Sequence, residues 1–249
     1  MKILKFVNKF LVCLLILFTF SVDNLFAIGP SDYILHQSLT LAEKEDGING
    51  KLQLLRDRRL TNDDIAILQQ HDPESALALK VNSFHPSVIR LVNSRNKIVK
   101  KISLEKLYAN IETKKIKKDS HRIILITQDF GIGMGSYNGP ITKILVIGPR
   151  KMSWAVARNL QTGHLELITL MRSLKTAWDF SAEKNDEKDI LKVSCRFDEN
   201  AKKSGFTTTY SRYHYLKNKW VLKKRSEDLL WEDESEDGKL PSVELFPKI

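Results

Sequence analysis

Ile123-Ile124-Leu125-Ile126 and Ile141-Thr142-Lys143-Ile144-Leu145-Val146-Ile147 are the two stretches that decide the fold class of this chain. Both are short runs rich in β-branched residues, which favour extended strands. Similar runs follow, and turn residues recur between them about every 8–12 positions. These further runs are 154–157, 165–168, 174–180, 190–197, 206–216 and 220–225. The pattern predicts an antiparallel β meander of seven or eight strands, forming a curved or barrel-like sheet.

The residues that precede these runs have a more mixed texture. Residues 32–41 are expected to be extended and to end at a turn over 46–50. Thr61 precedes two aspartates and then an apolar segment, which predicts the start of a helix. Ser103 is placed to cap a second short helix over 103–107. The expected fold class is therefore α+β, with short N-terminal helices packed on a mainly antiparallel sheet.

Two regions of the mature chain follow from this change of texture. Residues 28–118 are expected to form a mixed α/β region that packs on the sheet. Residues 119–249 are expected to form the antiparallel β region, which ends in an acidic C-terminal loop.

Residues 1–27 have the three parts of a secretory signal peptide. A lysine-rich start precedes an apolar run over 10–20, and the small residue Ala27 stands at the expected cleavage site. A membrane-spanning helix needs roughly 20 apolar residues, and this run is shorter. Cleavage is therefore favoured over a retained anchor. The mature protein would be bacterial, periplasmic or secreted, without a transmembrane segment.

Charge and cysteine content narrow the class of the mature protein. Removing three lysines and one aspartate from a chain of net charge +10 leaves a basic protein of charge +8. Cys195 would be its single cysteine, so no internal disulfide can form and the core must hold the fold. Because Cys195 lies inside a predicted strand, we expect it to be a small buried apolar residue.

The basic residues gather in two groups. The first group consists of Lys97, Lys100, Lys101, Lys106, Lys114, Lys115, Lys117 and Lys118. The second consists of Arg212, Lys217, Lys219, Lys223, Lys224 and Arg225, interleaved with Tyr210, Tyr213, Tyr215 and Trp220. Arg212, Tyr213 and Tyr215 are candidate ligand-binding residues, because cations beside aromatic rings suit anionic partners. The alternative is an ordinary solvated face above an aromatic core.

The segment Asp129-Phe130-Gly131-Ile132-Gly133-Met134-Gly135-Ser136-Tyr137 contains the letters of two phosphate-binding motifs. A dinucleotide-binding loop needs a helix after its glycines, whereas Pro140 and β-branched residues follow here. We therefore interpret the segment as a connection between strands, with Asn138-Gly139 as a two-residue turn. Loops on a rigid sheet often carry function, which makes Ser136, Tyr137 and Asn138 candidate ligand contacts.

The acidic segment near the C-terminus has oxygen-bearing side chains at the spacing of a calcium-binding loop. They are Asp233, Ser235, Asp237 and Glu244. Calcium prefers such hard oxygen ligands. Pro241 departs from the pattern, and no helix can follow the loop before Ile249. Calcium is therefore a candidate cofactor, and the alternative is a solvated acidic loop.

No catalytic or cofactor motif in the sequence has the context that its chemistry needs. The sequence favours a non-enzymatic exported protein that binds an anionic envelope component or another exported protein. Export argues against nucleic acid as the partner. The alternatives are an envelope-directed hydrolase, with His121, Asp129 and Ser136 as candidates, and a secreted factor that acts on a host or competitor.

Overall fold

A computed structural model describes residues 32–69, 83–115, 122–129, 139–148, 151–181, 189–232 and 246. These residues form a predominantly β structure with fifteen strands, distributed over three sheets of four, five and six strands. Among these strands every pair is antiparallel except β15 with β9, which run parallel.

The strands fall into three sheets. The first sheet contains β1 (Tyr33–Leu41), β2 (Gly50–Asp57), β3 (Val88–Asn93) and β4 (Ile98–Ser103). The middle sheet contains β5 (Tyr108–Lys115), β6 (Arg122–Asp129), β7 (Ile141–Gly148), β11 (Thr169–Met171) and, beside β7, β8 (Lys151–Trp154). The third sheet contains β9 (Val156–Asn159), β10 (Leu165–Leu167), β12 (Thr176–Phe180), β13 (Ile190–Phe197), β14 (Phe206–Leu216) and β15 (Lys219–Asp228).

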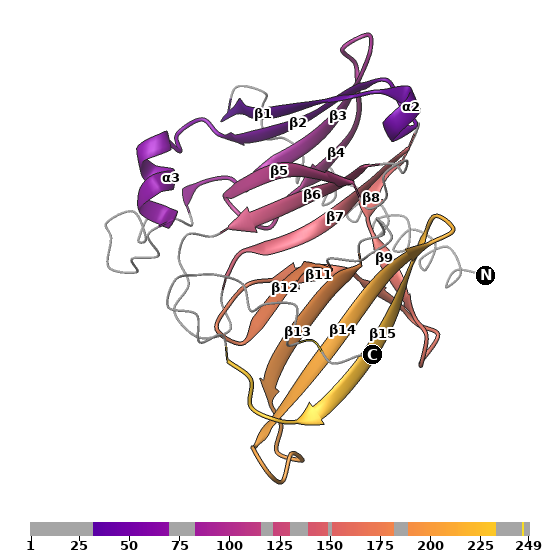
Figure 1. Ribbon diagram of the computed structural model, residues 1–249. Helices are drawn as coiled ribbons and strands as arrows, with labels where there is room; N and C mark the ends of the chain where they lie inside the picture. Colours follow the sequence, from indigo (N-terminus) through magenta and orange to yellow (C-terminus); the bar gives the residue numbers. More distant parts are fainter. Residues whose placement is uncertain are drawn as a thin grey trace, which may run out of the picture.

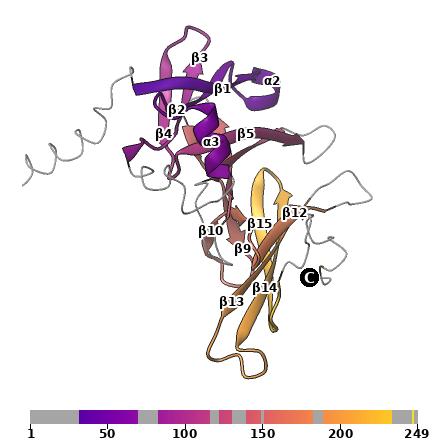
Figure 2. The same ribbon diagram turned by 90° about the vertical axis from the view of Figure 1, so that its left-hand side faces the viewer.

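The three sheets stack in layers (Figure 1), and the first and third lie at opposite ends of the molecule (Figure 2). The middle sheet is buried on both faces, because alternate residues of its strands enter different cores. Ile124 and Ile126 pack with the first sheet, whereas Ile123 and Leu125 pack with the third. This double burial explains why the run is apolar without alternation.

The chain crosses between the middle and third sheets twice, each time through a single residue and without a turn. The chain passes from β8 in the middle sheet to β9 in the third through Ala155, and it returns from β10 to β11 through Ile168. Ala155 N donates to Ile144 O at 2.8 Å, and Ile168 N donates to Ala155 O at 3.1 Å. The crossing at Ala155 divides the predicted run 154–157, and the crossing at Ile168 leads into β11, which lies outside the predicted runs. The region after residue 119 therefore has ten described strands.

The expectation of one curved or barrel-like sheet is corrected by this arrangement. Each of the three sheets, as far as it is described, is open and has two ends. A curved single sheet could bury only one set of alternate residues against its own interior. The crossings at Ala155 and Ile168 instead place two sheets face to face.

The helices among the described residues are short. α3 (Asn62–Gln69) begins where the sequence predicted, and Thr61 Oγ1 accepts a hydrogen bond from Asp64 N at 3.1 Å. α2 (Glu43–Asp46) lies at the end of β1. No described helix has the length and apolar character required to cross a bilayer.

The second predicted helix, over 103–107, does not form. Ser103 ends β4, and the chain then turns directly into β5. Leu104 N donates to Ser87 O at 2.8 Å, and Ser87 N donates to Lys106 O at 2.9 Å. These backbone bonds to the segment before β3 replace the local bonds that a helix would need.

Two polar side chains of the first sheet bind groups outside its strands. Gln37 binds the backbone of β5 through both ends of its amide, donating to Ile111 O and accepting from Ile111 N, each at 2.8 Å. Asp57 is fully buried at the end of β2 and accepts hydrogen bonds from Arg59 and from His85 N. Burial alone would raise the pKa of Asp57, but these hydrogen bonds lower it to about 2.

Candidate functional site

Several of the predicted site residues lie outside the described part of the chain. They are Ser136, Tyr137 and Asn138 of the glycine-rich segment, the calcium candidates Asp233, Ser235, Asp237 and Glu244, and His121. Of the hydrolase candidates, Asp129 is described and ends β6.

The three ligand-binding candidates on β14 point to two different faces of the third sheet. Tyr213 is 4% exposed and packs between the third and middle sheets. Burial raises its pKa to about 12. Tyr215 packs on Trp220 with ring centroids 5.0 Å apart. Arg212 alternates with these tyrosines, so it lies on the face turned away from the middle sheet.

Five lysines of the first basic group lie on or beside strands at sheet edges, whereas Lys106 lies between two strands and Lys117 and Lys118 lie outside the described residues. Lys97, Lys100 and Lys101 are exposed on or beside β4, which is the edge of the first sheet. Lys114 and Lys115 are exposed at the end of β5, the edge of the middle sheet. Lysine on an edge strand blocks pairing with another chain. A protective role therefore accounts for these residues without a ligand.

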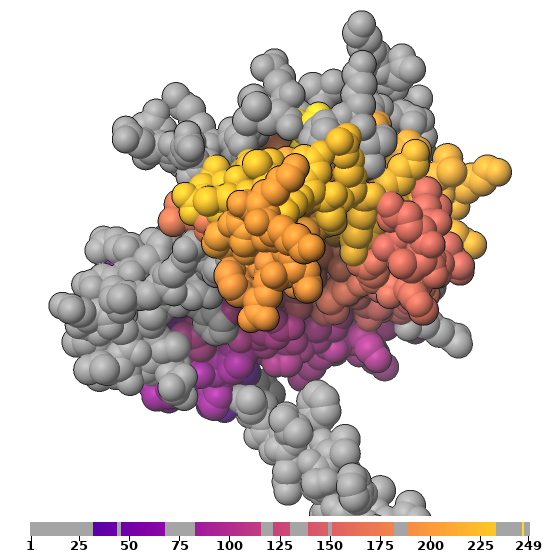
Figure 3. Space-filling view, turned by 90° about the horizontal axis from the view of Figure 1, so that it is seen from below, coloured from indigo at the N-terminus to yellow at the C-terminus, as the bar shows by residue number. Residues whose placement is uncertain are grey.

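The second basic group is concentrated on a sheet face. We call the outward face of β9, β14 and β15 the basic face, defined by Arg158, Arg212, His214, Lys219, Lys223 and Arg225. The strand register places Arg212 opposite Lys223, and Val221 beside both His214 and Arg158. In Figure 3, the orange and yellow surface of β14 and β15 meets the salmon segment that carries β9 and β10.

Among the described residues, two acidic side chains contact the basic face, and each already pairs with a cation of that face. Glu227 lies at its far end and pairs with Arg225 at 2.7 Å. Asp189 is buried beneath it and accepts a hydrogen bond from Arg212 Nε, while His214 Nδ1 lies 2.5 Å from Asp189 Oδ1. Lys219 and Lys223 are exposed. The described residues of this face therefore carry a net positive charge. The sequence predicted the cations of β14 and β15, but not the proximity of Arg158 and Asp189, because both are distant from these strands in the chain.

Asp189 and His214 resemble part of a catalytic triad, but the third member is missing among the described residues. A triad needs a nucleophile hydrogen-bonded to the imidazole. The hydroxyl of Ser181 accepts a hydrogen bond from Asp189 N at 2.9 Å, and no hydrogen bond between a hydroxyl and His214 is seen among the described residues. Asp189 therefore serves to orient Arg212 and His214 at the surface.

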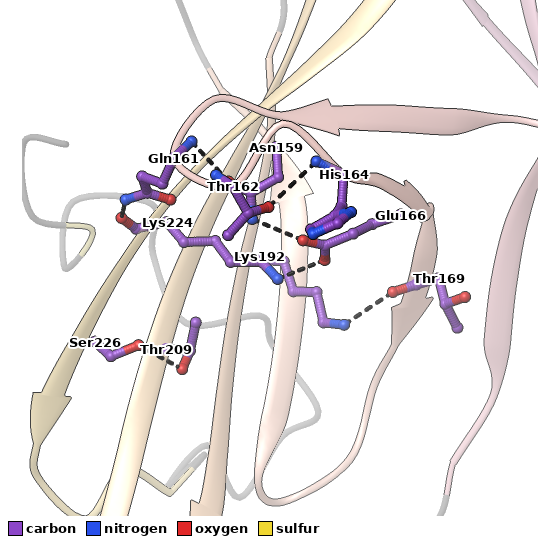
Figure 4. A network of polar contacts seen from close by, with 10 residues as sticks. All are labelled: Asn159, Gln161, Thr162, His164, Glu166, Thr169, Lys192, Thr209, Lys224 and Ser226. Atoms are coloured by element: carbon purple, nitrogen blue, oxygen red, sulfur yellow. Dashed lines mark hydrogen bonds and ion pairs between the residues drawn. The ribbon is translucent and has the colours of Figure 1, made fainter.

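A second polar cluster lies on the inward face of the third sheet (Figure 4). Glu166 accepts hydrogen bonds from Lys224 Nζ at 2.5 Å and from Asn159 Nδ2 at 2.7 Å. Asn159 Oδ1 in turn accepts from Gln161 N at 2.9 Å, which fixes the turn between β9 and β10. Lys224, predicted as part of the second basic group, is thus directed inward and neutralised.

Lys192 belongs to the same inward cluster and connects two sheets. Its Nζ donates to Thr169 O on β11 at 2.9 Å. Burial lowers the pKa of Lys192 to about 8, with the nearby charges of Arg196 and Lys224 adding to the effect. Because both lysines of this cluster are engaged within the protein, the basic face is the stronger candidate for binding a ligand.

The comparisons with known proteins leave the site to be interpreted from its own geometry. No family model matches the chain, and no match is found among curated proteins or among solved structures.

Proposed function

We propose that this chain is an exported protein, periplasmic or secreted, that binds anionic groups of the cell envelope through its basic face. The observation that carries the proposal is the concentration of exposed cations on one sheet face, with Lys219, Lys223 and Arg225 alternating along β15. A surface of one charge sign attracts an anionic partner over distances set by ionic strength.

The position of these cations favours binding over simple solvation. Arg212 and Lys223 stand directly opposite each other on neighbouring antiparallel strands. Like charges in this position destabilise a sheet, and Asp189, which contacts both Arg212 and His214, offsets only part of the positive charge of this face. An anionic ligand would neutralise the repulsion, so the arrangement suits a face that is covered when the protein acts.

The proposal is tested by retention of the purified protein on an immobilised anionic polysaccharide. The variant Lys219→Gln/Lys223→Gln/Arg225→Gln removes three charges from the basic face. We expect it to elute at much lower salt than the wild type, because each neutralised contact reduces the electrostatic attraction.

The matched control is Lys97→Gln/Lys100→Gln/Lys101→Gln, which removes the same charge from the edge of the first sheet. We expect this variant to elute near the wild-type position. Equal losses in the two variants would mean that net charge alone governs retention, and the assignment to the basic face would then be wrong.

A further inference from the structure

The basic face adjoins a group of exposed apolar side chains. Val156 is 44% exposed, Leu165 63%, Leu167 43% and Leu216 48%. Within β9 and β10, these residues alternate with Ala157 and Glu166, which face inward. All four apolar side chains therefore project from the outward side of the third sheet. We call them the apolar corner.

The strand register interleaves the apolar corner with cations. Leu167 stands opposite Val156, and Leu165 stands opposite Arg158. Leu216 stands opposite Lys219 across the turn between β14 and β15. Large apolar side chains gathered on an exposed face mark an interaction site. A partner that matches this surface must therefore present apolar groups next to anionic groups.

We propose that the apolar corner and the basic face together contact the surface of a bilayer that contains anionic lipids, an inference that rests on the proposed function. The cations would meet the headgroups, while the leucines and Val156 enter the boundary between headgroups and acyl chains. A soluble anionic polymer would match the cations and leave the apolar corner uncovered.

A protein partner fits the same surface less well. β10 is the edge of the third sheet, but it has three residues, which offers little backbone for an added strand. The cations are also spread among the apolar residues rather than placed around them as a polar rim. A lipid surface tolerates this mixture, because long basic side chains can extend past apolar neighbours to the headgroups.

The test measures co-sedimentation of purified protein with phosphatidylcholine vesicles and with vesicles of equal parts phosphatidylcholine and phosphatidylglycerol. The wild type is expected to pellet with the vesicles that contain phosphatidylglycerol and not with the vesicles of pure phosphatidylcholine. The variant Leu165→Ser/Leu167→Ser is expected to lower the vesicle partition coefficient by about tenfold or more. Its retention on the anionic polysaccharide should be unchanged, because it keeps every cation.

The control variant Leu35→Ser/Ile98→Ser changes two exposed residues of the first sheet, which are 53% and 47% exposed. It should partition like the wild type, and thermal melting would confirm that all variants are folded. If the wild type is retained on the polysaccharide but does not pellet with anionic vesicles, the bilayer inference fails and the proposed function stands. If it binds neither, both fail.

Equal vesicle binding by the wild type and Leu165→Ser/Leu167→Ser would also overturn the inference, since charge alone would then explain the contact. Weaker vesicle binding by Leu165→Ser/Leu167→Ser, together with normal vesicle binding by Leu35→Ser/Ile98→Ser, would support the bilayer inference.

Discussion

Arg212 and Cys195 illustrate which parts of a residue's role can be predicted from the sequence. Alternation along β14 correctly separates Arg212 from Tyr213, because strand geometry places successive side chains on opposite faces. The partner of Arg212 could not be predicted, since Asp189 lies 23 residues away in the chain and reaches it only through strand pairing. Cys195 is buried, as its position within a strand predicted.

The lowered pKa of Lys192 makes stability depend on pH in a defined direction. The folded protein holds this proton with a pKa of about 8, whereas the ordinary value is 10.5. Between these values the unfolded chain binds more protons, so the penalty from burying the charge is complete below pH 8 and is relieved as pH rises. The variant Lys192→Met lacks this group and its pH dependence.

Denaturant unfolding of both proteins from about pH 7 to about pH 10.5 measures this effect. The wild type should gain stability relative to Lys192→Met across that interval, by up to about 3 kcal/mol. A constant difference between the two proteins over the interval would contradict the burial of a charged amine at this position.

The sequence predicted the positions of most individual strands after residue 119, but it did not predict which strands share a sheet. The runs at 190–197 and 206–216 coincide with β13 and β14. The run at 154–157 is divided between β8 and β9, because the chain changes sheets at Ala155. The run at 165–168 holds β10 and ends at the crossing residue Ile168, and β11, which follows it, was not predicted. Apolar pattern reports that a residue is buried, but not which sheet buries it.

Gly139, which precedes β7, meets a steric requirement that the sequence does not show. The sequence predicted a two-residue turn over Asn138-Gly139, of which Asn138 lies outside the described residues. A Cβ at Gly139 would lie 1.7 Å from Arg172 O, a backbone atom. The glycine therefore permits the close approach of the segment that leaves β11.

The variant Gly139→Ala is expected to lower the free energy of unfolding by roughly 1–3 kcal/mol, because backbone must move to admit the methyl group. Gly148→Ala is the matched control at the other end of β7, where the nearest atom to an added Cβ is 3.9 Å away. Denaturant midpoints compare the two variants. Equal midpoints would argue against the close contact with Arg172.

On the scale of the whole molecule, the three layers give the third sheet a role distinct from the others. The middle sheet is covered on both faces, so it serves as the shared core. The outward side of the third sheet carries the basic face and the apolar corner. The sequence predicted a mainly antiparallel β protein, and it did not predict three layers, because that arrangement depends on two crossings without a turn signal.

The measurement that tests the central claim most directly is co-sedimentation of the purified protein with cell envelopes at low and high salt. The wild type should pellet at low salt and be released at high salt, because screening weakens the attraction between the basic face and anionic groups. The variant Lys219→Gln/Lys223→Gln/Arg225→Gln should stay in the supernatant at both salt concentrations. Pelleting of this variant to the same extent as the wild type would contradict the claim that the basic face binds the envelope.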